Sequence, residues 1–317
     1  MNVMFTSVGR RVELVHAFRD AYTALGLTGN IIGTDIDRLA PAYNIVDRPY
    51  LVPRTDSPEF VGEILDICQK EKVDLVFPLT DYDIPVLAAK KEAIKAAGAA
   101  AVVIEPEPAA ITGDKMRTNR FFAEMGLDVG RCWEPDQVLA EEVGYPLFLK
   151  PRQGSASQHT HKIADAEELA FYLPRVPNPM LQEYLSGIEV TNDVICSLQG
   201  EALAVVSRRR IEVRWGEVQK GVTVHDPAIQ EGCLAVARGL NAVGPITVQC
   251  IVVDGRPYFT EVNARYGGGC PLGVAAGANS PLWLLAEAAG IAVDIPPLGD
   301  YRVGLHLSRY DTSMFIE

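Results

Sequence analysis

Three side chains with oxygen donors are spaced so that two short strands would set them on one face of a sheet. Gln249, Glu261 and Asn263 lie in two apolar runs joined at Asp254-Gly255, a pair typical of a β-hairpin turn. Glu261 and Asn263 are two positions apart, so both leave the same face of a strand, and Gln249 can stand beside them from the partner strand. Such hard oxygen donors suit magnesium shared with nucleotide phosphates better than zinc. Arg265 could then meet the γ-phosphate.

A triple glycine follows this set at once. Gly267, Gly268 and Gly269 come directly after Tyr266. Consecutive glycines destabilise a folded chain unless the backbone approaches a ligand closely or takes unusual dihedral angles. We therefore prefer a metal site to the alternative that Glu261 and Asn263 merely lie on a solvated sheet face.

Two further segments could hold a nucleotide. A predicted strand ends in Lys150, and the small residues 154–157 that follow could fold over phosphates with backbone amides and hydroxyls. A surface hairpin turn explains this loop equally well, and it is not the G-x-x-x-x-G-K-[ST] phosphate loop. Residues 182–185 could offer adenine an exposed strand edge, with Glu189 for the ribose hydroxyls, although an ordinary strand has the same pattern.

An α/β unit must precede these segments. Apolar runs alternate with helical patterns, which predicts a parallel sheet with crossover helices. The predicted strands are 3–6, 31–35, 74–78 and 101–104. Helices are predicted where apolar residues recur on one face, at 12–25 and 60–67, and over 85–97. The first turn, Ser7 to Arg11, lacks the three glycines of a dinucleotide site, which disfavours NAD or FAD.

Beyond residue 112 the pattern becomes α+β around an antiparallel sheet. The predicted elements are a helix at 114–125 and strands at 145–150, 191–197, 202–206, 247–253 and 257–262.

Composition excludes several classes of protein. The 317 residues suit two or three subdomains, and 48% hydrophobic with 22% charged residues predicts a globular chain. A net charge of −12 argues against a nucleic-acid binder, which needs clustered Lys and Arg. The six scattered cysteines show no zinc spacing, so we expect most to be buried. No signal-peptide or membrane-span pattern is visible, so we expect no membrane partner and a cytoplasmic location.

Read in order, these segments resemble the ATP-grasp superfamily, and most nearly the large subunit of carbamoyl phosphate synthetase and its stand-alone relatives. The resemblance rests on Gly113-Asp114-Lys115, residues 148–151, the loop 154–157, residues 182–185 with Glu189, Gln249, and residues 261–265. It implies a Rossmann-like pre-ATP-grasp domain at 1–112, a mobile ATP-grasp lid subdomain at 113–180, and a C-terminal ATP-grasp subdomain with the metal site at 181–317.

The resemblance also implies a role for individual residues. It assigns ATP phosphates and adenine to Lys115 and Lys150, the phosphate lid to Ser155 and Ser157, adenine to Gln182, Glu183, Tyr184 and Leu185, ribose to Glu189, two magnesium ions to Gln249, Glu261 and Asn263, and the transferred phosphoryl group to Arg265. Manganese could replace magnesium. Ala156 and His159 stand where relatives often have glycine, and Gln249 replaces the carboxylate of many members, as in carbamoyl phosphate synthetase. We expect a single stand-alone ATP-grasp unit, because no room is left for a second.

A basic cluster lies between the predicted adenine and metal strands. Arg208, Arg210 and Lys220 could line a carboxylate pocket or meet phosphate, and in so acidic a protein they would attract an anionic substrate. A solvated charged turn is the alternative. At the carboxyl edge of the parallel sheet, Asp81 could hold the amino group of a second substrate and Arg10 a carboxylate, although Asp81 could equally cap a helix.

Together these features predict an ATP-dependent carboxylate–amine ligase that forms an acyl phosphate and releases ADP and phosphate. Its partners would be small carboxylates and amines, with a homodimer possible. Two alternatives remain: a Rossmann-type NAD-dependent oxidoreductase, and a nucleotide-binding module without catalysis.

Overall fold

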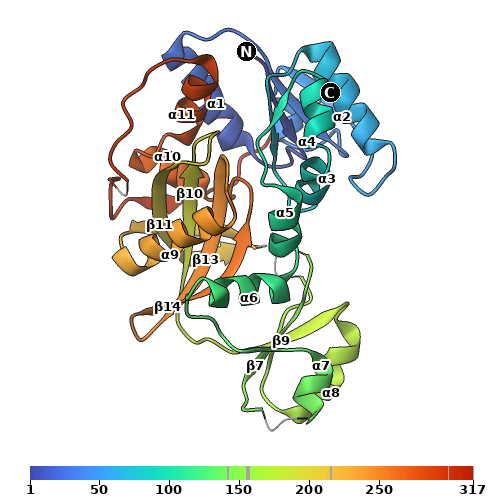
Figure 1. Cartoon of the computed structure of the whole chain (residues 1–317), viewed down its shortest axis with the longest axis vertical. Helices are drawn as coiled ribbons and strands as arrows, with labels where there is room; N and C mark the ends of the chain where they lie inside the picture. The colour runs from blue at the N-terminus through green and yellow to red at the C-terminus, as the bar shows by residue number, and fades with distance from the viewer. Residues whose placement is uncertain (141–142, 155–157, 215, 299, 317) are drawn as a thin grey trace.

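In the computed structural model, which describes residues 1–140, 143–154, 158–214, 216–298 and 300–316, the chain forms a five-stranded, a six-stranded and a four-stranded sheet. Figure 1 shows the five-stranded sheet at one end of the long axis, the six-stranded sheet in the middle and the four-stranded sheet at the other end. Residues from all three regions line one cavity.

The N-terminal sheet is parallel, in the order β3-β2-β1-β4-β5. Its strands are β1 (Val3–Thr6), β2 (Ile31–Asp35), β3 (Arg48–Leu51), β4 (Leu75–Pro78) and β5 (Ala100–Ala101). β1, β2 and β4 are buried along their whole length, as the continuous apolar runs of a sheet covered on both faces require. The predicted Rossmann-like domain is confirmed.

Helices connect these strands: α1 (Val12–Leu25), η1 (Ala42–Asn44), α2 (Phe60–Glu71), α3 (Asp83–Ala88) and α4 (Lys91–Ala96). α1 buries one stripe that includes Val15 and Phe18 and ends at Gly26, which has the left-handed φ of 62° that glycine favours at a helix end. The single helix predicted at 85–97 is wrong, because Lys90 leaves the helical conformation (φ −117°, ψ 12°) and separates α3 from α4.

The strand predicted at 101–104 is shorter than expected. Only Ala100 and Ala101 pair with β4, and Val102 adds one further backbone hydrogen bond, to Val76. Val103 and Ile104 are buried in the core, and α5 (Pro106–Thr112) begins directly after them. α5 and β3 have few apolar residues, so the apolar pattern of the sequence does not predict them.

The lid sheet is the four-stranded sheet in the order β6-β9-β7-β8. Its elements are β6 (Cys132–Trp133), α7 (Pro135–Ala140), β7 (Leu147–Pro151), β8 (His161–Ile163), α8 (Ala166–Tyr172), η2 (Leu173–Arg175) and β9 (Pro179–Glu183). It has a small core of its own, in which Trp133 and Leu147 pack with Leu169 and Val176. In Figure 1 it lies beyond α6 (Lys115–Glu124), away from the N-terminal sheet.

The central sheet is the antiparallel six-stranded sheet β14-β13-β10-β11-β12-β15. Its strands are β10 (Ile188–Cys196), β11 (Ala202–Arg214), β12 (Glu217–Val224), β13 (Pro245–Val253), β14 (Arg256–Asn263) and β15 (His306–Ser308), and its helices are α9 (Pro227–Gly239), α10 (Cys270–Ala276) and α11 (Ser280–Ala289). The hairpin turn expected at Asp254-Gly255 is confirmed, since both residues have positive φ.

The two faces of the central sheet bury different helices. Val194 packs with α9, whereas its neighbour Ile195 packs with α10 and α11, as the alternation of side chains along a strand requires. α11 also packs against α1, which joins the N-terminal sheet to the C-terminal helices. α6 packs on β14 through the ring pair Phe122–Phe259, at 5.8 Å between centroids. The exact domain limits at 112 and 180 stay predictions.

The cysteines have the expected structural character. Five of the six are buried, and Cys132 is partly buried. Burial raises the pKa of the Cys196 thiol to about 11 and that of the Cys250 thiol to about 12. These thiols are therefore protonated near neutral pH and behave as small apolar side chains. Within the described residues, no helix is both long and apolar enough to cross a membrane.

Candidate active site

A cavity of about 750 Å³ lies between the lid sheet, the central sheet and the loop after β4. We call it the main cleft. It brings together most of the residues singled out from the sequence: Asp81, Lys115, Lys150, Gln182, Glu183, Tyr184, Leu185, Glu189, Arg210, Gln249, Glu261, Asn263 and Arg265. Ser155 and Ser157 lie outside the described residues, so the predicted phosphate lid is not tested here.

The oxygen-bearing set has the arrangement that its spacing predicted. Gln249 on β13 pairs directly with Glu261 on β14, and Asn263 follows two positions along. A β-bulge at Thr260 interrupts this pairing, and the Thr260 hydroxyl donates to the Gln249 carbonyl at 3.2 Å. The extra residue of the bulge reverses the alternation of side chains along β14. Phe259 therefore points into the core, whereas Glu261, two positions later, lines the main cleft.

The lid sheet contributes a buried lysine opposite this set. Lys150, at the end of β7, has only 7% of its surface exposed, and its Nζ donates to Oε1 of Gln182 at 2.7 Å. Burial lowers the pKa of Lys150, and nearby Lys115 lowers it further, whereas the Glu261 carboxylate opposes this change. The ammonium group therefore lies among the charges of the main cleft, where anionic phosphates would stabilise its charged form.

A second lysine is held at the start of α6. Asp114 caps this helix, accepting from the backbone N–H groups of Met116 and Arg117, and also pairs with Arg152 at 2.6 Å. The next residue, Lys115, donates from Nζ to the carbonyl of Gly154 at 2.7 Å. The cap thus fixes the helix end so that Lys115 reaches the loop that follows β7.

The predicted adenine segment is a strand end followed by a loop. Gln182 and Glu183 close β9, and a Glu183 carboxylate oxygen accepts from the backbone N–H of Arg131 at 3.3 Å. Tyr184 lies beyond the strand, with the Lys162 ammonium 4.3 Å from its ring centre. Glu189 lies after this loop, near the start of β10, and its carboxylate pairs with Arg210 at 3.1 Å.

The basic cluster is part of the central sheet, so the alternative of a solvated turn is wrong for Arg208 and Arg210. Both lie on β11 within paired register. Arg208 is 3% exposed and makes two hydrogen bonds to Asp193, at 2.9 and 3.1 Å. It lines a second, smaller cavity beside the main cleft. Lys220 lines neither cavity, because it points to Glu212 on the neighbouring strand, and both side chains are half exposed.

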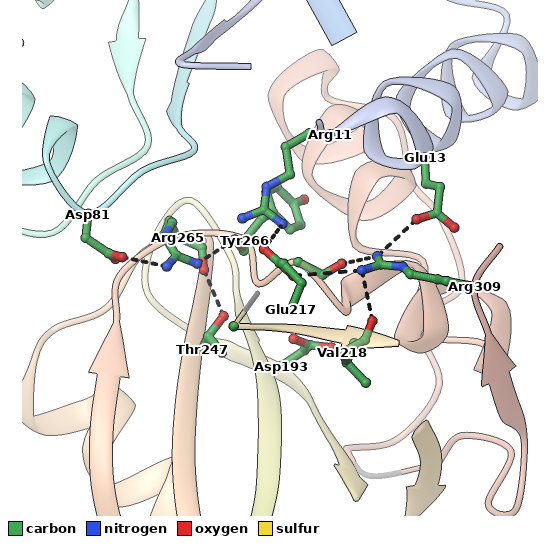
Figure 2. A network of polar contacts seen from close by, with 12 residues as sticks. Arg11, Glu13, Asp81, Asp193, Glu217, Val218, Thr247, Arg265, Tyr266 and Arg309 are labelled. Atoms are coloured by element: carbon green, nitrogen blue, oxygen red, sulfur yellow. Dashed lines mark hydrogen bonds and ion pairs between the residues drawn. The ribbon is translucent and has the colours of Figure 1, made fainter. Parts of the chain in front are cut away.

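Arg265 and Asp81 meet each other across the boundary between the N-terminal and central sheets. Nη2 of Arg265 lies 2.6 Å from Oδ2 of Asp81, and Figure 2 shows this pair at the edge of a larger polar network. Burial lowers the pKa of Arg265, but the Asp81 carboxylate outweighs it and the net change is upward. Oδ1 of Asp81 and Nε of Arg265 are buried without a hydrogen-bond partner. Such atoms are expected where a ligand completes the site.

Several residues of this network were not predicted, among them two arginines. Arg11, and not Arg10, lines the main cleft, and it pairs with Glu217 at the start of β12, at 3.3 Å. Arg309, far along the chain, lies 3.8 Å from Glu217 and 3.0 Å from Glu13 on α1. Spacing alone does not separate Arg10, which is exposed, from Arg11. Both follow a turn in which Ser7 and Gly9 have left-handed φ angles, of 53° and 48°.

The triple glycine lets side chains lie flat on its backbone. A Cβ at Gly268 would stand 1.6 Å from a Glu217 carboxylate oxygen, and a Cβ at Gly269 would stand 2.5 Å from the guanidinium carbon of Arg208. None of the three has a positive φ. Of the two reasons offered for this triplet, close approach is therefore confirmed and unusual dihedral angles are wrong.

The donor set in the main cleft fits magnesium that is shared with phosphates. Within the described part of the chain, no group of three or more His, Cys, Asp or Glu could hold a metal without other ligands. Gln249, Glu261 and Asn263 supply one carboxylate and two amides, all on one wall of the cleft. Magnesium commonly takes one or two carboxylates, with water and substrate phosphates completing its shell.

A central antiparallel sheet and a smaller lid sheet face each other across a cleft, behind a Rossmann-like domain, and this is the arrangement of the ATP-grasp fold. Comparison with known proteins agrees. Residues 3–103 match the family model of the PylC-like N-terminal domain, and residues 175–304 match that of ATP-grasp in the biosynthetic pathway with Ter operon. These two matches cover the Rossmann-like domain and most of the central-sheet region, in the order in which the fold has them.

Among its relatives, the carbamoyl phosphate synthase large chain of Deinococcus deserti is 28% identical over 313 residues, which cover 90% of this chain and 29% of that protein. The D-alanine–D-alanine ligase of Leptospira interrogans is 27% identical over 234 residues, 63% of this chain and 64% of that protein. The chain thus spans less than a third of the carbamoyl phosphate synthase large chains it matches.

Solved structures share the fold at low identity. The biotin carboxylase complex from Campylobacter jejuni has a TM-score of 0.76 at 15% identity, covering 96% of this chain and 74% of that one. The N5-carboxyaminoimidazole ribonucleotide synthetase of Thermus thermophilus has a TM-score of 0.71 at 16% identity, covering 92% and 79%. The biotin carboxylase domain of 2-oxoglutarate carboxylase from Hydrogenobacter thermophilus, solved with MgADP and bicarbonate, has a TM-score of 0.74 at 16% identity, covering 96% and 73%.

Proposed function

We propose that the chain is an ATP-dependent ligase that joins a carboxylate to an amine through an acyl phosphate, with release of ADP and phosphate. The observation that carries this proposal is the pairing of two walls of one cleft. Gln249, Glu261 and Asn263 face it from the central sheet, and Lys115 and Lys150 face it from the lid side. A triphosphate between these walls would meet cations on one side and metal-binding oxygens on the other.

The nucleotide would lie along the lid side of the cleft. We propose that Lys115 and Lys150 bind phosphates, that residues 182–185 hold adenine, and that Glu189 binds the ribose. The pairing of Glu189 with Arg210 supports this role, because it holds the carboxylate at the rim of the cleft. Gln249, Glu261 and Asn263 would hold two magnesium ions, which would supply positive charge to offset the negative charge that develops during phosphoryl transfer.

Two balanced steps make up the reaction. A carboxylate oxygen of the first substrate attacks the γ-phosphorus, the bond between that phosphorus and the bridging oxygen of ADP breaks, and ADP leaves. The amine nitrogen then attacks the carbonyl carbon of the acyl phosphate and loses a proton, and phosphate leaves with the former carboxylate oxygen. Arg265, held beside the cleft by Asp81, would steady the transferred phosphoryl group.

The second substrate would enter from the N-terminal sheet. Asp81 keeps one oxygen buried without a partner, which supports its role as acceptor for an amino group. Arg11 lines the same side of the cleft and takes the place that we had expected for Arg10. Both residues come after strands of the parallel sheet, at its carboxyl edge. This edge faces the central sheet, and it is where open parallel sheets bind their ligands.

The direct experiment is a screen for phosphate release over amino-acid pairs, bicarbonate and simple amines in the presence of Mg-ATP. We expect ADP and phosphate to appear in equal amounts, and only when both a carboxylate and an amine are present. AMP with pyrophosphate as coupled products would overturn the mechanism. ATP binding without turnover would favour a non-catalytic module, and tight NAD binding without ATP binding would favour the oxidoreductase alternative.

A further inference from the structure

Glu217 lies where the main cleft opens into the smaller cavity. Its side chain is 44% exposed and lines both. The smaller cavity has a volume of about 70 Å³ and a polar wall, formed in part by Arg208, Arg210, Arg265 and the backbone of the triple glycine. Such a volume is enough for a small polar group but not for a whole nucleotide or a large side chain.

Two arginines pair with the Glu217 carboxylate. Arg11 lies 3.3 Å from one carboxylate oxygen and Arg309 lies 3.8 Å from the other, and Figure 2 shows Arg11 approaching it from above and Arg309 from the right. Burial lowers the pKa of Arg11. The positive charges of Arg265 and Arg309 lower it further, whereas the Glu217 carboxylate is the main group that raises it. An anion is therefore strongly favoured at this point.

Two other acidic residues of the network, Asp193 and Asp81, are held more firmly. Asp193 makes two hydrogen bonds to Arg208 and is 6% exposed, and Asp81 lies 2.6 Å from Arg265. Glu217 has longer contacts and much greater exposure. Its carboxylate also rests on the bare backbone of Gly268, with no Cβ to hold it in place. Of these three anions, Glu217 is therefore the one whose displacement breaks the fewest close contacts.

We propose that Glu217 is an internal carboxylate that occupies the seat of the substrate carboxylate between Arg11 and Arg309, and that a substrate carboxylate binds by displacing it. This inference rests on the proposed function and names the group that the second cavity receives. Displacement has a consequence for specificity. A ligand must outcompete Glu217, so its apparent affinity is lowered by the fraction of molecules in which the seat is filled.

Acetate is the probe that tests this seat without any turnover. Wild-type protein, Glu217→Ala and Glu217→Gln are titrated with sodium acetate, and the shift in unfolding temperature gives an apparent Kd. Alanine vacates the seat, whereas glutamine keeps its volume but removes the charge. We expect acetate to bind Glu217→Ala about tenfold more tightly than wild type, with Glu217→Gln between the two. Glu212→Ala, which removes a half-exposed carboxylate on the adjoining strand of the same hairpin, is the matched control and should follow wild type.

The origin of the gain is tested by adding Arg11→Gln to Glu217→Ala, which should abolish it. Equal acetate affinity in wild type and both Glu217 variants would overturn the proposal, as would a gain that survives the loss of Arg11. If Glu217→Ala fails to fold, the comparison of Glu217→Gln with wild type decides alone. Because the titration contains no ATP, its outcome is independent of the phosphate-release screen. A silent screen with a positive acetate result would refute the ligase reaction and leave the carboxylate seat standing.

Discussion

Replacing Glu261 by glutamine is expected to lower turnover by about 100-fold or more while the fold stays intact. Glu261 is the carboxylate of the oxygen set, and the bulge at Thr260 aims it into the main cleft opposite Lys150. Glutamine has nearly the same shape but removes the charge that would hold the metal ions on the phosphates. Steady-state release of ADP, with the substrates that the phosphate-release screen identifies, measures the loss.

Glu231→Gln is a suitable control for this variant, because it makes the same chemical change on the exposed side of α9. It should retain wild-type turnover. Equal unfolding temperatures of Glu261→Gln and wild type would show that the loss does not come from unfolding. Wild-type activity in Glu261→Gln would mean that Glu261 belongs to an ordinary strand and not to a metal site.

The second large effect is expected on stability. Asp193→Asn should lower the free energy of unfolding by about 3–5 kcal/mol, because it leaves the guanidinium of Arg208 buried without its counter-charge. Both side chains are almost completely buried, at 6% and 3% exposure, and Arg208 lies directly on Gly269. Urea-induced unfolding followed by circular dichroism gives the change in free energy.

An exposed ion pair provides the matched comparison. Asp56 pairs with Arg54 at 3.2 Å, and both side chains are more than 70% exposed, so Asp56→Asn should change stability by less than about 0.5 kcal/mol. A loss below about 1 kcal/mol in Asp193→Asn would contradict a structural role for this pair. It would return Arg208 to the substrate role that the sequence alone suggested.

The sequence predicted those parts of the molecule that depend on local pattern. The hairpin at Asp254-Gly255 and the shared face of Glu261 and Asn263 follow from turn chemistry and from the alternation of a strand. The buried strands β1, β2 and β4 follow from uninterrupted apolar runs. In each case the interactions that determine the structure lie within a few residues of one another, so the spacing of residue types along the sequence is enough to predict it.

Features that depend on contacts distant in sequence were missed. Simple alternation would put Phe259 and Glu261 on the same face, and only the bulge at Thr260 separates them. Arg309 meets Glu13 across 296 positions, and no local pattern could pair them. Lys220 was expected in the site because it belongs to a basic cluster, yet a neighbouring strand offers it Glu212 instead. The cytoplasmic location and the homodimer stay predictions.

The fate of the carboxylate oxygen tests the central claim most directly. The carboxylate substrate found in the phosphate-release screen is labelled with ¹⁸O in both oxygens and turned over with Mg-ATP and the amine. The phosphate and the nucleotide are then analysed by mass spectrometry. An acyl phosphate requires one ¹⁸O per turnover in the released phosphate and none in the nucleotide. Label in AMP, or phosphate free of label, would show that the carboxylate never attacks the γ-phosphate and would contradict the proposed mechanism.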